Sequence, residues 1–409
     1  MLPASDKEIL RDLARQQLDV AHSEKNKARV ALWRRHNALH GERPVIHLEL
    51  DTFEQEVIPP RLRCESEEGR ALETELYRQF LNLTLFDDDW VVPDFFPVTA
   101  KTWFHPFGHK ITRTFASNHS VGHHFNYIIS DLEDDWDKVG KSDFGIDHDA
   151  TDRALSLAAD TFGDILPVRL TGSGLYVCLT QDIVHLMGME VMCFSMYDYP
   201  ELFCKMMDQL ANDYLSFFGL LKREGGLLPT TGFEHVGQGT LCFTDELPGE
   251  TITGPGDVWG FMDSQETVSI SPKMFADFIF PAYQKVASTY GLLSYGCCEP
   301  VHPVWDCIGS LDNLRKVSIS PWCNEDIMAE RLRGSRTIYH RKPSPNFLGV
   351  NPTLDEDAFR AHIRKTLQTA RGCHVEITQR DVYTIHHNED KARRYVAIIR
   401  EEIEKNWQP

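Results

Sequence analysis

The most constraining feature of this sequence is an alternation of short apolar runs with helical segments through its second half. Strand-like runs at 292–296, 314–320, 337–340 and 374–378 are each followed by a stretch with helical character. This alternation is typical of β–α units around a parallel sheet. In a chain of 409 residues it predicts an α/β fold, a (β/α)8 or TIM barrel. No glycine-rich phosphate loop follows a strand, which argues against an open dinucleotide-binding sheet.

The first part of the chain differs from this pattern. Ser5 and Glu8 have the spacing of a helix capping box and precede an apolar stripe. We therefore expect residues 1–40 to be an N-terminal helical extension and residues 41–409 to form the barrel. The stretch at about 97–150 is irregular and rich in histidine, and we interpret it as an insertion or a lid.

The composition of the chain excludes several classes of binding partner. The formal net charge of -19 argues against a nucleic acid or an anionic membrane, because both need a basic surface. The ten cysteines form no CxxC pair, which favours reduced thiols in a cytoplasmic enzyme over a disulfide framework. The start of the chain is charged, and no apolar run approaches the roughly 18 residues of a membrane span. We expect a cytoplasmic protein with a small-molecule substrate; a homodimer is left open.

One cluster at a predicted strand end can bind a metal. In barrels the catalytic groups collect at the carboxyl ends of strands. Thiolates and carboxylates are zinc ligands, and three protein ligands with one open position define a catalytic zinc site. Such a zinc lowers the pKa of a bound thiol or hydroxyl and activates it. The alternatives are a buried packing pair of cysteines or a vicinal disulfide. The predicted zinc ligands are Cys297, Cys298, Glu299 and Asp381.

Other polar residues near predicted strand ends could bind substrate or move protons. Arg341 would pair with a carboxylate or phosphate, or would close the barrel rim in a salt bridge. His235 lies in a segment rich in Gly and Thr that could be only a structured loop. Glu376 lies inside a strand and either orients another group or is a buried, satisfied carboxylate. The candidate substrate-binding residues are Arg341, Lys342, Trp322 and Gln265, and the candidate catalytic residues are Asp381, His235 and Glu376.

The order and spacing of several motifs resemble uncharacterised members of the uroporphyrinogen decarboxylase superfamily. The resemblance covers roughly residues 165–406. It implies a (β/α)8 barrel and one of two activities: porphyrinogen decarboxylation, or methyl transfer between a corrinoid protein and a thiol or another acceptor. The matching motifs are Ser264-Gln-Glu266, Ser271-Pro272, Tyr295-Gly-Cys-Cys-Glu-Pro300, Asn313-Leu-Arg-Lys-Val317, Ser320-Pro321, Arg341-Lys-Pro-Ser-Pro345 and Glu376 with Arg380-Asp381.

The methyltransferases of that superfamily bind zinc through a His-x-Cys-Gly motif and a later Cys near the last strand. Cys297 falls on the first Cys of this pattern, whereas Tyr295 replaces the His and Cys298 replaces the Gly. Asp381 falls near the later Cys. The resemblance thus implies one matching zinc ligand, with Glu299 and Asp381 as oxygen replacements.

These observations lead to one main hypothesis and two alternatives. The main hypothesis is a zinc-assisted methyltransferase that moves a methyl group between a small substrate or thiol and a corrinoid carried by a partner protein. The first alternative is a metal-independent lyase or decarboxylase, with Arg341 holding a small carboxylate and Asp381 or His235 moving protons. The second is a non-catalytic protein that binds a corrinoid or tetrapyrrole. The Arg-rich N-terminal motif of the decarboxylase and the D-x-H-x-x-G cobalamin motif are both missing from the sequence.

Overall fold

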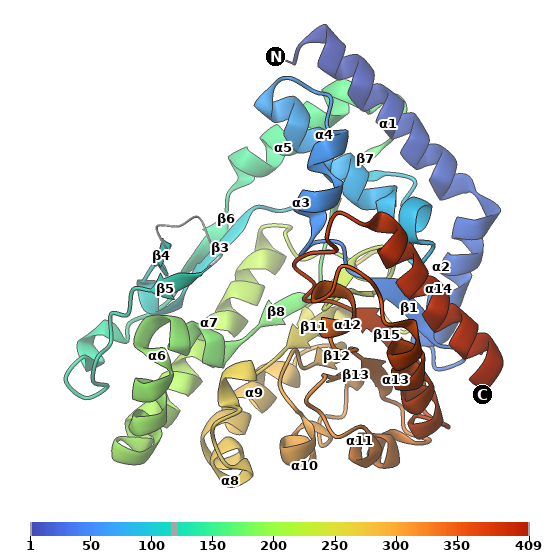
Figure 1. The fold of residues 1–409 in the computed structure, drawn as a ribbon. Helices are drawn as coiled ribbons and strands as arrows, with labels where there is room; N and C mark the ends of the chain where they lie inside the picture. The colour runs from blue at the N-terminus through green and yellow to red at the C-terminus, as the bar shows by residue number, and fades with distance from the viewer. Residues whose placement is uncertain (1, 116–121, 408–409) are drawn as a thin grey trace.

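The computed structural model describes residues 2–115 and 122–407, and its centre is a parallel sheet of seven strands (Figure 1). The strand order is β1-β15-β14-β13-β12-β11-β8, and every neighbouring pair is parallel. The carboxyl ends of all seven strands therefore lie at one edge, which confirms the predicted α/β class. The strands are β1 (Val45–Leu48), β8 (Leu175–Val177), β11 (Trp259–Met262), β12 (Leu292–Tyr295), β13 (Leu314–Ile319), β14 (Ile338–Arg341) and β15 (Val375–Gln379).

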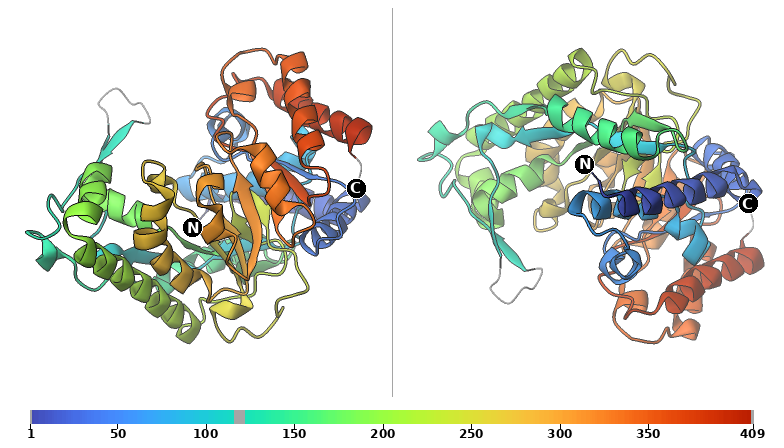
Figure 2. Two further views of the ribbon diagram at one scale, coloured as in Figure 1. Left: turned by 90° about the horizontal axis from the view of Figure 1, so that it is seen from below. Right: turned by 90° about the horizontal axis from the view of Figure 1, so that it is seen from above.

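Helices follow these strands and cover the sheet. Asn324, Asp355 and Asn388 each accept a backbone N–H at the start of a helix, the usual role of an N-cap. The green helices α6 and α7 and the red helices α13 and α14 lie at opposite ends of the molecule (Figure 2). The helices of the second half are α6 (Leu179–Asp198), α7 (Pro200–Arg223), α8 (Pro272–Met274), α9 (Phe280–Ala287), α10 (Trp305–Ile308), α11 (Glu325–Leu332), α12 (Asn346–Gly349), α13 (Glu356–Thr369) and α14 (Glu389–Asn406).

The first helix packs against other helices, and the second also contacts strand β1 of the central sheet. Helix α1 (Ala4–His22) contacts α4 (Glu67–Leu81) and α5 (His148–Phe162), and α2 (Glu24–Asn37) follows it. The predicted capping box at Ser5 is wrong. Pro3 is the N-cap of α1 and makes no side-chain hydrogen bond, whereas Ser23 caps α2. A short helix, α3 (Glu54–Val57), lies between β1 and α4.

The sheet of the described residues is not closed, so the predicted eight-stranded barrel is not observed. Strand β1 is one edge and β8 is the other. The backbone N–H groups of Ile46 and Leu48, which a neighbouring strand would bind, donate instead to the carboxylates of Asp89 and Asp88, each at 3.0 Å. Side chains therefore satisfy this edge of β1 in place of an eighth strand.

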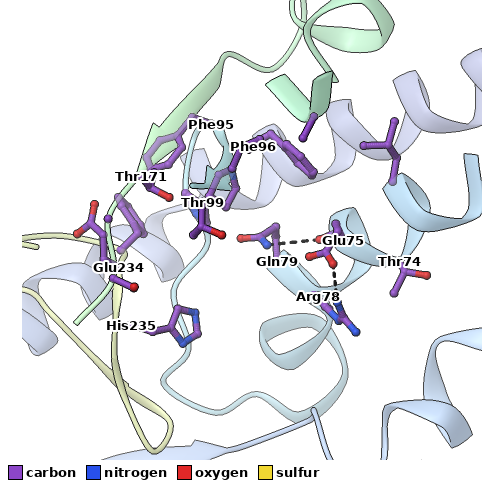
Figure 3. A pocket seen from close by; sticks show the side chains of 18 of the residues that line it. Thr74, Glu75, Arg78, Gln79, Phe95, Phe96, Thr99, Thr171, Glu234 and His235 are labelled. Carbon is purple, nitrogen blue, oxygen red and sulfur yellow. Dashed lines mark hydrogen bonds and ion pairs between the residues drawn. The ribbon is translucent and has the colours of Figure 1, made fainter. Parts of the chain in front are cut away.

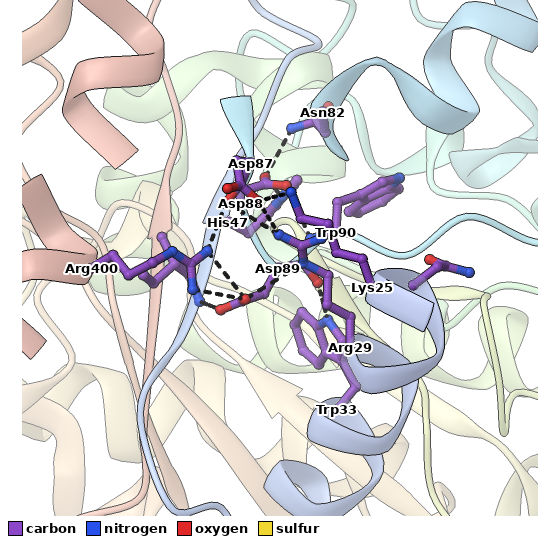
Figure 4. A network of polar contacts seen from close by, with 12 residues as sticks. Lys25, Arg29, Trp33, His47, Asn82, Asp87, Asp88, Asp89, Trp90 and Arg400 are labelled. Atoms are coloured by element: carbon purple, nitrogen blue, oxygen red, sulfur yellow. Dashed lines mark hydrogen bonds and ion pairs between the residues drawn. The ribbon is translucent and has the colours of Figure 1, made fainter. Parts of the chain in front are cut away.

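An ion-pair network holds these acidic residues in place (Figure 4). Asp89 is 1% exposed and pairs with Arg43 at 2.7 Å and with Arg400 at 3.4 Å. Asp88 accepts from His47 at 2.8 Å and from Asn82 at 3.0 Å. Buried carboxylates are tolerated when they are paired and hydrogen-bonded in this way. Asp88 and Asp89 thus end the sheet at β1.

The region predicted as an insertion forms antiparallel pairs outside the central sheet (Figure 1). Strand β3 (Thr102–His105) pairs with β6 (Asp143–Ile146), and β4 (Arg113–Phe115) pairs with β5 (His123–Phe125). Strand β7 (Val168–Thr171) also lies outside the central sheet and forms a separate parallel pair with β2 (Phe96–Thr99). Another small pair is β9 (His235–Gly237) with β10 (Thr240–Leu241).

All ten cysteines lie among the described residues and are free thiols, in agreement with the predicted absence of a disulfide framework. Among the residues that the structure describes, no helix combines the length and apolar character that crossing a membrane requires.

Candidate functional site

A cavity of about 640 Å³ lies at the carboxyl ends of the central strands. Its walls include the predicted thiols Cys297 and Cys298 and the predicted ligand Asp381. Trp322 and Gln265, predicted to contact substrate, also line it. Residues that the sequence analysis did not select also line it, among them Tyr176, Gln238, Phe261, Asp263, Arg380 and Tyr383.

The thiol pair is positioned by a turn directly after β12. Gly296 has φ +97°, a conformation that favours glycine, and a Cβ there would lie 3.1 Å from Cβ of Ser318. This turn brings the Sγ atoms of Cys297 and Cys298 to 3.5 Å from each other. The Cys298 Sγ also lies 3.5 Å from Oδ2 of Asp381, which follows β15. Residues 83 positions apart therefore meet at the base of the cavity.

The charges around the pair favour one thiolate. The hydrogen bond from Cys298 lowers the pKa of Cys297 to about 7, and the charges of Lys342 and Arg380 act in the same direction while burial opposes them. The same bond raises the pKa of Cys298. Nη1 of Arg380 lies 3.8 Å from Sγ of Cys297. A thiolate on Cys297 is thus stabilised by a donor thiol and two cations.

Glu299 supports the loop more than it faces the cavity. Its Oε1 accepts the N–H of Ser264 at 3.0 Å, and its Oε2 accepts the N–H of Cys297 at 2.8 Å. Both carboxylate oxygens thus bind backbone, and the side chain is 4% exposed. Glu299 was predicted to bind zinc, but both of its oxygens are occupied by these bonds. The residue instead connects the turn after β12 to the end of β11.

A second cavity of about 660 Å³ adjoins the first. Gln265, Cys298 and Trp322 line both. The second cavity is also lined by Phe125 of β5 and His185 of α6, whose rings stack at 3.8 Å between centroids. The region predicted as an insertion or lid therefore contributes a wall beside the thiols.

The structure brings together a set of residues that the sequence analysis missed. Potential ligand atoms of Cys178, Asp263 and Glu266 all lie within 4.8 Å of one another, and all three side chains are buried. This group could hold a metal ion. Cys178 directly follows β8 and Asp263 directly follows β11, two short strands that the sequence analysis did not identify. The available signal was Glu266 in the Ser264-Gln-Glu266 motif.

The predicted residue Arg341 does not reach the cavity. Its guanidinium pairs with Glu325 on α11 at 2.9 Å and donates to the carbonyls of Ile319 and Ser320. The structure therefore shows the rim salt bridge and not a free substrate-binding cation. Lys342 does not itself line the cavity, but its Nζ donates at 2.6 Å to Oε1 of Gln238, which does. Burial and the charge of Arg380 lower the pKa of Lys342 to about 8.

Glu376 and His235 lie apart from the thiols. Glu376 is 0% exposed, and its Oε2 pairs with Lys316 at 2.8 Å and with His36 at 3.3 Å, whereas its Oε1 has no hydrogen-bond partner. It is therefore a buried, charge-paired carboxylate. His235 lines a different cavity of about 850 Å³, between α4 and the β2–β7 pair (Figure 3). The ring of His235 lies 5.0 Å from that of Trp90. Neither residue lines the two cavities beside Cys297.

Comparison with known proteins shows a likeness of fold. No family model matches the sequence, and no curated protein does. A solved structure with a similar fold is that of a methyltransferase from Methanosarcina mazei, at a TM-score of 0.53 and 12% sequence identity. The match covers 91% of this chain and 98% of the other. At this identity the likeness concerns the fold, and the chemistry must be argued from the site.

Proposed function

We propose that the protein is a methyltransferase that moves a methyl group between a small substrate or thiol and a corrinoid held by a partner protein. The observation that carries this proposal is the Cys297–Cys298 pair, which faces a cavity at the strand ends beside Asp381, Lys342 and Arg380. The name of the Methanosarcina mazei neighbour and the resemblance to the uroporphyrinogen decarboxylase superfamily support the same reaction class. On this view, the aspartates at 88–89 replace the strand that would close the barrel.

The thiol pair and Asp381 fit a zinc ion in part. With Zn–S near 2.3 Å and Zn–O near 2.0 Å, two ligands of a tetrahedral zinc lie roughly 3.5 Å apart. Cys298 Sγ lies at 3.5 Å from both of its neighbours. The three atoms are not all within 4.8 Å of one another, so Asp381 would have to move toward Cys297 when the ion binds. Bound there, zinc would lower the pKa of a substrate thiol or hydroxyl.

The chain's own residues have separate tasks in this scheme. Arg380 and Lys342 offset the negative charge of the Cys297 thiolate. Glu299 fixes the backbone that carries the thiol, through its bonds to the N–H groups of Ser264 and Cys297. Trp322 is 75% exposed at the junction of the two cavities, where substrate and a docked partner would both reach it. In the transfer, the acceptor atom forms a bond to the methyl carbon while the bond between that carbon and the donor atom breaks. The electron pair of the broken bond stays with the donor atom.

A metal-independent lyase has less support. That alternative needs Arg341 to hold the acid, but Arg341 is 2% exposed and paired with Glu325. A carboxylate on a substrate in the cavity would meet Arg380 instead, which is already paired with Glu49 at 2.7 Å. The proposed homodimer and the lid role of residues 97–150 stay predictions.

The direct test is methyl transfer by the full-length, zinc-loaded protein. Methylcobalamin serves as donor and 2-mercaptoethanol as acceptor, and loss of the methyl–cobalt absorbance is followed together with the thioether product. We expect turnover that Cys297→Ser reduces at least about 100-fold, as for loss of a direct metal ligand. The control is Cys373→Ser, because the Cys373 thiol donates to Ala329 O away from the cavity. Equal rates in the wild type and Cys297→Ser would contradict the proposal.

A further inference from the structure

A second group of potential ligands lies beside the thiol pair, at the ends of two adjacent strands. Cys178 follows β8, Asp263 follows β11, and Glu266 lies in the helical turn Gln265–Thr267. Their exposures are 3%, 2% and 8%. Because β8 and β11 are hydrogen-bonded neighbours, the order of the sheet itself brings these side chains together.

Hydrogen bonds hold the group in a built arrangement. The Cys178 Sγ lies 3.6 Å from Oε2 of Glu266, and the same oxygen accepts from Oγ1 of Thr180 at 2.9 Å. The hydroxyl of Tyr283 lies 2.9 Å from Oγ1 of Thr180 and donates to the carbonyl of Asp263 at 2.8 Å. The thiol and the Glu266 carboxylate are thus oriented before any ligand arrives.

One oxygen in this group lacks a partner. Oδ1 of Asp263 has no hydrogen-bond partner, and the residue is only 2% exposed, so water does not reach it freely. Arg380, which lines the same cavity as Asp263, is paired with Glu49 instead. A buried carboxylate oxygen without a partner has lost the hydrogen bonds that water would donate to it, which is unfavourable. Two carboxylates and a thiol at this spacing therefore need either protons or a positive ion.

We infer that Cys178, Asp263 and Glu266 form a second metal site, separate from the thiol pair, for a divalent ion of the zinc type. One soft sulfur and two hard oxygens favour zinc or cobalt over magnesium or calcium, which prefer oxygen alone. Three protein ligands leave one position open. Asp263 lines the first cavity and Glu266 lines the second, so the open position would face these two cavities.

This inference does not rest on the methyltransferase proposal. The Cys178 group is assembled from β8 and β11, whereas the proposed catalytic zinc uses residues after β12 and β15. The two sites are therefore separable by substitution. An ion at the second site would also place positive charge near the Cys297 thiolate, because Asp263 and Cys297 already interact electrostatically.

The test is Co²⁺ titration of the full-length, metal-stripped protein, because cobalt–thiolate bonds absorb in the near ultraviolet and visible. We expect two ions per chain in the wild type. Asp263→Asn keeps the shape of the side chain and removes a charged ligand, so it should bind one ion, and Cys178→Ser should also bind one and lose part of the thiolate absorbance. The affinity at the altered site should fall by more than the roughly 10–100-fold that loss of an outer partner costs.

Further results decide between the two sites. Cys297→Ser should keep the ion of the second site, and Cys373→Ser should bind as the wild type does. Full binding by both Asp263→Asn and Cys178→Ser, in protein with wild-type circular dichroism, would overturn the inference. A third outcome is a wild type that binds a single ion, which Cys178→Ser loses and Cys297→Ser keeps. This outcome would support the second site and contradict the proposed catalytic zinc. If Cys178→Ser fails to fold, Asp263→Asn alone decides.

Discussion

Two buried polar clusters occupy the same parallel sheet and differ in charge balance. Around Glu376, a single carboxylate lies 2.8 Å from Lys316, 3.3 Å from His36 and 3.5 Å from His340. Each cluster has one buried carboxylate oxygen without a hydrogen-bond partner, Oε1 of Glu376 and Oδ1 of Asp263. They differ in their neighbours, because Lys316 pairs with Glu376 whereas no cation pairs with Asp263 among the described residues.

The pKa values of the two carboxyl groups move in opposite directions. Burial opposes ionisation of Glu376, but Lys316 and the two histidines hold its pKa well below the usual range. Burial, together with the charge of Glu299, raises the pKa of Asp263 well above its usual range. A balanced cluster holds the fold together, whereas an unbalanced one beside a cavity is typical of a functional site.

The largest expected effect comes from breaking the balanced cluster. Glu376→Gln should leave the Lys316 ammonium buried without its counter-charge and cost about 3–5 kcal/mol of unfolding free energy. Chemical denaturation measures this, and Co²⁺ binding by the folded fraction should not change. A loss below about 1 kcal/mol would mean that Glu376 is not the structural residue described above.

A third carboxylate sharpens the comparison through pH. Asp182 of α6 accepts from the hydroxyl of Tyr214 at 2.6 Å, and burial raises its pKa to about 7. A raised carboxyl pKa gives stability that is fully present below the unfolded value near 3.9 and is lost as pH rises through 7. Asp182→Asn should therefore gain up to a few kcal/mol relative to the wild type between pH 4 and pH 8. Parallel stability curves would contradict the assignment.

A smaller effect is expected from Asp263→Asn in metal-free protein. Because Asp263 has no cation to lose, the substitution should change the unfolding free energy by about 1 kcal/mol or less at pH 7, or should raise it. Thermal unfolding of the stripped protein measures this. A destabilisation as large as that of Glu376→Gln would show that the two clusters are equivalent.

The smallest effect is expected at His235. This residue lines the cavity of about 850 Å³ beside Trp90 and not the cavities around Cys297. His235→Ala should leave methyl transfer within about twofold of the wild type, as expected for a residue that does not touch the reacting atoms. A tenfold loss in kcat would contradict this prediction and show that His235 takes part in catalysis.

The sequence predicted β12, β13, β14 and β15 because each is an apolar run followed by a helical segment. It missed β8 and β11, which have three and four residues, and with them Cys178 and Asp263. The prediction that the strands close into a barrel was wrong, because aspartate side chains and not a strand bind the N–H groups of Ile46 and Leu48. No pattern in one sequence reports which strand edge a side chain will cap.

The direction in which a side chain points was the second property that the sequence did not predict. Cys297 and Cys298 could be placed from the strand end that precedes them. Arg341 and Lys342 are adjacent and both basic, yet one pairs with Glu325 on a helix and the other reaches Gln238 at the cavity. A difference of one residue along the chain turns a side chain to the opposite face, and the sequence alone did not fix that register.

The central claim is that the strand-end cluster is unbalanced because it binds metal. Crystals of the zinc-loaded, full-length protein, measured on both sides of the zinc absorption edge, test it most directly. We predict anomalous peaks between Cys178, Asp263 and Glu266 and beside Cys297 and Cys298, with none near Glu376. Zinc-loaded crystals with no peak at either strand-end site would contradict the account.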